Sequence, residues 1–374
     1  MKVTLRAIFG VSALAFLLTA TPAMASQVDV SGENVDTGAD SDNDNKFDVD
    51  DDLDVNVKNK ADVDNKAKVD ADTGDNEQNK NTNAGDLDTG VVDASADWEN
   101  VVNAGASLMG ADDNGLDVGA DFVNDTTGFD SDNDNKLDVD QDVDLVLKNF
   151  ADIFNKLDFD ADTGDNEQNK NTNAGDMETG AAGLETIIGN FANNDTGFAG
   201  AAGYGVTVDV TAENNTTGAD SDNDNKVDVD NDYDLNIKNK ADVDNKIKVD
   251  IDTGGNEQNK NTNAGDLNTG DGEVVVDIEN SVNNGGGAAG AAGGSLDVEA
   301  DFTNDTTGAD SDNTNKLDVD NDVDVVVKNT ADVENKTKVE VDTGDNDQNK
   351  NTNAGSTETG DVDIELNITN EVNS

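Results

Sequence analysis

The feature that most restricts the fold of this 374-residue chain is a repeat of 90 residues. The motif S-D-N-[DT]-N-K opens at four positions: Ser41, Ser131, Ser221 and Ser311. A D-T-G motif ends at Gly74, Gly164, Gly254 and Gly344. Every interval is 90 residues, with no insertion or drift. Such regularity predicts structural units that stack on, or join to, their own kind.

Within each repeat, apolar residues alternate with polar ones. From Phe47 to Ala71 nearly every odd position is apolar and the even positions are almost all Asp, Asn or Lys. A period of two over this length indicates half-buried β-strand, although an acidic chain with few aromatic residues is also typical of disorder. Strands usually run about 5–6 residues, so we expect corners at Asn59, Asn65 and their counterparts. The pattern predicts five or six short strands per repeat.

The predicted fold is all-β, with four tandem 90-residue repeats in a β-solenoid or cross-β stack. Four separate β-sandwich beads are the alternative. Stretches rich in Gly and Ala separate the repeats and are expected to be linkers. The predicted segments are a signal peptide at 1–25, repeats at 26–103, 116–192, 206–283 and 296–374, and linkers at 104–115, 193–205 and 284–295.

The first residues have the layout of a secretory signal. Lys2 and Arg6 precede a mostly apolar run over residues 7–18, and Ala23-Met24-Ala25 is an A-x-A cleavage site. No later apolar run reaches the roughly 20 residues that span a bilayer. We therefore expect a secreted, extracellular or cell-surface protein that begins at Ser26 and has no membrane span.

Composition narrows the possible chemistry. The chain has no His and no Cys, and its formal net charge is −61. It therefore lacks the usual zinc ligands and thiol nucleophiles, and its charge repels nucleic acid and anionic lipid. Carboxylates are abundant, but they recur identically in each repeat and give no copy a unique pocket. We expect no enzyme, and cations as the natural small partners.

Acidic residues cluster where each long alternating stretch begins. Side-chain oxygens at positions 1, 3, 5 and 9 of Asp40–Asp48 resemble the calcium loops of EF-hand and thrombospondin type-3 repeats. The resemblance implies a Ca²⁺ site in each repeat; a solvated acidic turn is the alternative. The candidate ligands are Asp40, Asp42, Asp44 and Asp48; Asp130, Asp132, Asp134 and Asp138; Asp220, Asp222, Asp224 and Asp228; and Asp310, Asp312 and Asp318.

A cluster of Asn and Gln follows each D-T-G motif. In the first repeat it comprises Asn76, Gln78, Asn79, Asn81 and Asn83. Identical amides stacked along an axis form hydrogen-bonded ladders, whereas an Asn-rich loop with Asx turns is the simpler interpretation. The run G-D-N-E-Q-N-K-N resembles the G-D-N-x-Q-x-x-N repeat of Fap-type functional amyloid subunits, and curli subunits carry similarly spaced Gln and Asn. The resemblance implies self-association.

Two functions fit these observations. The first is a structural protein that forms or decorates an extracellular fibre, matrix or surface coat. The second is a calcium-stiffened adhesin that binds a mineral, ice or host surface. The expected partners are further copies of the chain or other surface proteins, together with divalent cations.

Overall fold

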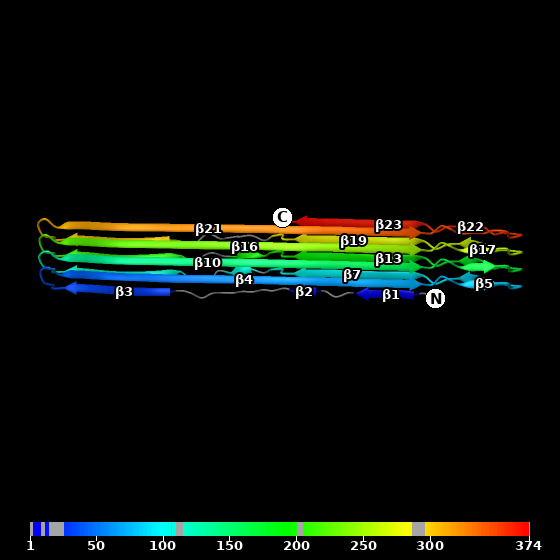
Figure 1. Ribbon diagram of the computed structural model, residues 1–374, viewed down its shortest axis with the longest axis horizontal. Coiled ribbons are helices and arrows are strands. Elements are labelled where there is room, and N and C mark those ends of the chain that lie inside the picture. Colours follow the sequence, from blue (N-terminus) through cyan, green and yellow to red (C-terminus); the bar gives the residue numbers. More distant parts are fainter. Residues whose placement is uncertain are drawn as a thin grey trace.

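The computed structural model describes residues 3–8, 12–14, 26–105, 107–109, 115–199, 205–285 and 296–373. These residues form strands joined by turns, stacked in four levels (Figure 1). The all-β prediction is confirmed. Each level is one 90-residue repeat, and we call it a rung.

Equivalent strands recur in every rung. Each rung opens with a 10-residue strand: β3 (Ser26–Val35), β9 (Leu116–Asp125), β15 (Val206–Asn215) and β20 (Leu296–Asp305). A 31-residue strand follows: β4 (Asp42–Asp72), β10 (Asp132–Asp162), β16 (Asp222–Asp252) and β21 (Asp312–Asp342). An 11-residue strand comes later: β7 (Val92–Val102), β13 (Ala182–Ala192), β19 (Gly272–Val282) and β23 (Val362–Val372).

The remaining strands are short. At one tip lie β5 (Glu77–Asn79), β11 (Glu167–Asn169) and β17 (Glu257–Asn259), then β6 (Leu87–Asp88), β12 (Met177–Glu178), β18 (Leu267–Asn268) and β22 (Thr357–Glu358). The others are β1 (Val3–Ile8), β2 (Ser12–Leu14), β8 (Ser107–Met109) and β14 (Gly197–Ala199).

Strands pair in parallel with their counterparts in the next repeat. Leu137 of β10 is level with Phe47 of β4 on one side and Val227 of β16 on the other, and the whole 31-residue strand keeps this register. The long sheet has the order β21-β16-β10-β4, and apart from β1 and β2 the other sheets are likewise built from equivalent strands. This pairing confirms the stacked-repeat alternative and rules out separate sandwich beads, whose strands would pair within a repeat.

The corners predicted at Asn59 and Asn65 do not exist. Both residues lie inside the continuous strand β4. Their side chains occupy inward-facing positions and hydrogen-bond along the stack, with Asn59 Nδ2 donating to Asn149 Oδ1 at 2.8 Å. A 31-residue strand spans about 100 Å at 3.3 Å per residue. In-register pairing with a neighbouring rung along its whole length allows it to run far beyond the usual strand length.

The long sheet forms one layer, and two shorter sheets cover its inner face near the start and near the end of the long strands. Near the start of the long strands, Leu116 and Phe122 of β9 pack with Leu137, and the rings of Phe47 and Phe122 stack with centroids 5.6 Å apart. Near their end, Leu184 of β13 packs with residues such as Phe159 of β10. The apolar residues predicted at odd positions of the long strand therefore point into the core.

The rungs differ in how completely their apolar residues are covered. Leu137 and Val227 in the inner rungs are 0% and 1% exposed, whereas the equivalent Leu317 in the last rung is 45% exposed. Within the described residues, one edge of β21 has no paired strand. The last rung therefore exposes apolar side chains that are buried in the inner rungs, beside a strand edge that has no partner among the described residues.

Two predicted features fall partly outside the described residues. The cleavage site at Ala23–Ala25 lies outside them, and β3 begins at Ser26. Strands β1 and β2 pair with β7. Of the predicted linkers, residues 110–114, 200–204 and 286–295 are also outside the described ranges, while β8 and β14 pair with each other. The described part contains no helix long and apolar enough to cross a membrane.

Candidate functional site

The D-T-G motif builds the turn that ends each long strand. The backbone N–H of Gly164 donates to Asp162 Oδ1 at 2.8 Å, which makes an Asx turn. Thr163 Oγ1 donates to the carbonyl oxygen of Gly180 at 2.7 Å and ties the turn to the chain returning from the tip. Asn166 Nδ2 donates to the carbonyl oxygen of Thr163 at 2.9 Å. The motif therefore fixes the tip loop that carries the Asn/Gln cluster.

The predicted amide ladders form in this tip. Asn76 Nδ2 donates to Asn166 Oδ1 at 2.9 Å, and Gln168 Nε2 donates to Gln78 Oε1 at 3.0 Å. The other three members bond to their counterparts as well: Asn79 Oδ1 accepts from the backbone N–H of Asn169, the N–H of Asn81 donates to Asn171 Oδ1, and Asn173 Nδ2 donates to Asn83 Oδ1. The cluster holds adjacent rungs in register.

A second set of ladders, buried in the core, was not predicted. Asn155 is fully buried; its Nδ2 donates to Asn245 Oδ1 at 2.8 Å and to Asn190 Oδ1 at 2.9 Å. The second bond connects the long sheet with the sheet of β13. Buried polar groups are costly unless they are hydrogen-bonded, so these ladders favour a single register. Asn at an inward position in all four repeats was the sequence signal for them.

The candidate calcium ligands do not form a loop. Asp42, Asp44 and Asp48 lie on the extended strand β4, where alternate residues point to the same side about 7 Å apart. Asp40 and its counterparts precede the strand in a left-handed turn, with φ between 56° and 60°. Within the described ranges, no three acidic side chains come together as they would around a metal ion. Calcium binding itself stays a prediction.

Lysines pair with several of these carboxylates. Lys46 Nζ lies 3.0 Å from Asp44 and 3.2 Å from Asp134 of the next rung, and these two bonds raise the lysine's pKa to about 12. In the other rungs the corresponding lysine pairs instead with the aspartate two residues after it, at 2.7 Å: Lys136 with Asp138, Lys226 with Asp228, and Lys316 with Asp318. The remaining candidates occupy matching positions: Asp130, Asp220 and Asp310 in the turn, and Asp132, Asp222, Asp224 and Asp312 on the strand.

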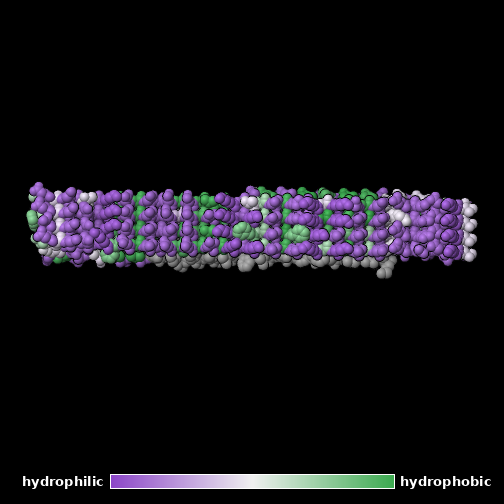
Figure 2. All heavy atoms as spheres, in the orientation of Figure 1, coloured by the Kyte–Doolittle hydropathy of each residue, from purple (hydrophilic) through white to green (hydrophobic). Residues whose placement is uncertain are grey.

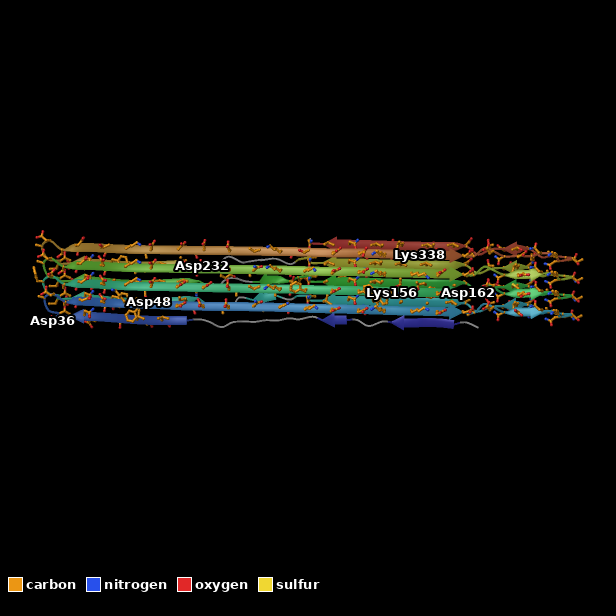
Figure 3. All side chains as sticks on the ribbon, viewed as in Figure 1. Asp36, Asp48, Lys156, Asp162, Asp232 and Lys338 are labelled. Carbon is orange, nitrogen blue, oxygen red and sulfur yellow. The ribbon has the colours of Figure 1, made fainter. Side chains whose placement is uncertain are left out.

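In-register stacking places like charges in rows along the outer face. Asp140 is level with Asp50 and Asp230, and Figure 2 shows the resulting polar rows. Desolvation, followed by repulsion from Asp50 and other neighbours, raises the pKa of Asp140. Asp162, labelled in Figure 3, shows the largest effect: burial and then the charge of Asp252 raise its pKa to about 6, against a bond from Gly164 that lowers it. At neutral pH the repulsion within these rows of ionised carboxylates therefore destabilises the stacking of the rungs.

We expect mild acid to stabilise the fold. A carboxyl whose folded pKa lies above its unfolded pKa of 3.8 destabilises the fold when ionised, and the penalty lifts as the pH falls from about 6 towards 3.8. The pKa is also raised for four other carboxyls: Asp132, Asp142, Asp230 and Asp242. Thermal melting at pH 7, 5.5 and 4.5, at constant ionic strength, should give a rising midpoint. A midpoint that falls over this interval would contradict the account of the rows.

Comparison of the chain with protein families, with curated proteins and with solved structures finds no match.

Proposed function

We propose that this chain is a secreted structural protein that forms or decorates an extracellular fibre, matrix or surface coat, and that it is not an enzyme. The observation that carries the proposal is the pairing of each long strand with its counterparts 90 residues away, which leaves the last described rung with an open edge. An open parallel edge is a template for further pairing. Soluble monomers block such edges with charged side chains, Pro or bulges; the long strands carry charged side chains but contain no Pro.

The outer face supports a role at a hydrated surface. Its rows of Asp and Lys hold water and counterions and keep copies apart at low ionic strength. Salt screens this repulsion within about 10 Å at 0.1 M, and divalent cations such as Ca²⁺ can bridge carboxylates of neighbouring rungs. Association with other copies should therefore depend on salt and on calcium.

One observation favours the second function, binding to a regular surface. The outward residues form a grid with about 7 Å between side chains along a strand and about 4.8 Å between strands. A mineral, ice or host lattice with matching spacing would meet rows of Asp such as Asp138, Asp140 and Asp142 on β10. In this role the chain would act as a single rod.

Microscopy of the exported chain separates the two functions. We expect filaments several hundred ångströms long in 0.5 M NaCl or millimolar calcium, and dispersed particles of about 100 Å in low salt with chelator, because screening removes the repulsion between charged rows. Dispersed particles under all conditions would contradict the fibre proposal and favour the surface-binding rod. Equal effects of magnesium and calcium at matched ionic strength would mean that the cation acts through its charge alone.

A further inference from the structure

The two ends of the stack are chemically different, and each lacks the neighbour that every inner rung has. At the repeat-four end, Leu317, Ile364 and Leu366 are 45%, 47% and 46% exposed, while their inner counterparts are almost fully buried. We propose that a second copy of the chain docks there, with its repeat-one rung on the repeat-four rung of the first copy, so that the 90-residue register continues across the joint. This inference rests on the proposed fibre function and specifies its contact.

Glycines in the inner rungs show what close stacking requires. A Cβ added to Gly254 would overlap the carbonyl oxygen of Gly344 in the next rung, and a Cβ added to Gly128 would overlap the backbone of Gly38. Both overlaps lie far inside van der Waals contact, so only glycine allows the rungs to approach at these positions. The requirement comes from the neighbouring rung, since these glycines do not have positive φ angles.

The end rungs keep glycine where their own chain does not require it. A Cβ on Gly38 or Gly85 would meet no atom within 4 Å, and one on Gly344 would meet only the Asp342 carboxylate at 3.3 Å. In an isolated chain Gly38 and Gly85 have room for a side chain, and Gly344 has no backbone of a further rung against it. A docked copy would place its rung against them and restore the overlap seen inside the stack. The end rungs are therefore shaped for a further rung.

Hydrogen-bonded rows give the joint a direction. Asn43 Nδ2 donates to Asn133 Oδ1 at 2.8 Å, Asn133 to Asn223 at 2.9 Å, and Asn223 to Asn313 at 2.9 Å. The row thus presents an oxygen at the repeat-one end and an N–H donor at the repeat-four end. Head-to-tail docking joins donor to acceptor, whereas joining two identical ends would oppose like groups. The joint is heterologous and leads to an open, polar filament.

Two rows are complementary at the joint itself. Gln141 Nε2 donates to Asp51 Oδ2 at 3.1 Å, and Asn231 Nδ2 donates in the opposite direction to Asn321 Oδ1 at 2.6 Å. These four residues form one row along the stack. The row ends in an amide donor at Asn321 and in an acceptor-only carboxylate at Asp51, and docking brings these two ends together. In a neighbouring row, Thr314 replaces the aspartate of the other rungs and would lie against Asp44. The joint thus avoids one like-charge contact that the inner rungs contain.

The N-terminal strands compete for the same edge. Strands β1 and β2 pair with β7, with Val3 level with Val92 and Ser12 level with Asn100. Strand β23 of a docked copy would need this edge of β7, because inside the stack β23 pairs with β19 in the equivalent way. Docking therefore requires β1 and β2 to leave β7. The predicted cleavage after Ala25 would remove both.

The test compares how exported variants of the chain assemble into filaments. Intact mass identifies the first residue of each chain and so shows whether β1 and β2 have been removed. The double variant Gly38→Ala and Gly85→Ala should melt like the wild type, since both new methyl groups point into open space, but should not form filaments in 0.5 M NaCl. The matched control is Gly183→Ala on the side wall, where the Cβ meets Glu273 O at an ordinary 3.6 Å. It should assemble at the wild-type rate.

A second variant tests the joint without adding bulk. Asn321→Asp keeps the acceptor that Asn231 uses but removes the donor that faces Asp51 of the docked copy and adds a charge there. It should keep the wild-type melting midpoint and assemble at least about tenfold more slowly at pH 7, the rate change that corresponds to 1.4 kcal/mol. Wild-type assembly rates in both variants would overturn the rung-on-rung joint while leaving the fibre proposal intact. Failure of the wild type to assemble under any condition would overturn both.

Discussion

A chain reduced to its second repeat, residues 116–205, is expected to be unfolded. The three main sheets take one strand from each repeat, so a lone rung has no strand to pair with β10 or β13. Its backbone groups would have only water as partners, and its apolar side chains would lack the rungs above and below. Repeat proteins derive most of their stability from such interfaces between neighbours.

The measurement is far-UV circular dichroism and thermal melting of chains with one, two and four repeats. We expect no cooperative transition for one repeat, a weak one for residues 116–295, and the highest midpoint for all four, because the number of rung interfaces rises along this series. Low salt and micromolar concentration keep single repeats from stacking on each other, since their charge repels. A single repeat that melts cooperatively at the temperature of the four-repeat chain would contradict the stack.

Replacing Asn245 by Asp should destabilise the whole chain by about 3–5 kcal/mol at pH 7, the cost of an unpaired buried charge. Asn245 is fully buried, and its Nδ2 donates to Asn335 Oδ1 at 2.7 Å and to Asn280 Oδ1 at 3.2 Å. Aspartate has the same shape but cannot donate when ionised, so its oxygens would face those of Asn335 and Asn280. The loss should shrink in mild acid, where the carboxyl takes up a proton.

Urea unfolding at pH 7 and pH 4.5 measures this effect. The matched control is Asn353→Asp, an exposed ladder residue whose Nδ2 donates to Asn263 Oδ1 at 2.7 Å. It should change the free energy of unfolding by no more than about 0.5 kcal/mol. Equal effects of the two substitutions would contradict the claim that the buried ladder fixes the register.

Much of the fold follows from two periods in the sequence. The 90-residue period predicts the rung, and the alternation from Phe47 to Ala71 predicts which side chains face inward, as the burial of Leu137 and Val139 in the equivalent strand confirms. Both predictions are reliable because in-register stacking places the same kind of residue at the same position of every rung. The pairing partner of each strand is then its own counterpart.

Other parts could not be predicted from local pattern. Asn59 and Asn65 suggested corners because Asn interrupts apolar alternation, and only the stacked structure shows these side chains bonding to their own copies. The acidic segment from Asp42 to Asp48 has the spacing of a calcium loop, but parallel pairing on β10 holds it straight. The covering of one long sheet by two shorter ones also leaves no local signal, since all three share the same alternation.

The 90-residue register is tested most directly by paired cysteines, which the cysteine-free chain makes possible. Asp142 and Asp232 are level on adjacent strands, and both are exposed. Their Cα atoms lie about 4.8 Å apart, within the range of about 4.4–6.8 Å that a disulfide needs. In Asp142→Cys with Asp232→Cys, mild oxidation of the dilute chain should form an intramolecular disulfide far faster than in a pair that the register holds apart.

The control pair is Asp142→Cys with Asp228→Cys, which the register sets four residues apart along the strand, or about 13 Å. This pair should stay reduced under the same oxidation, and non-reducing peptide mapping distinguishes the two cases. Rapid closure of the level pair, with the offset pair left open, is the result that stacking at 90 residues predicts. Equal and slow closure of both pairs would mean that neighbouring repeats are not aligned rung on rung.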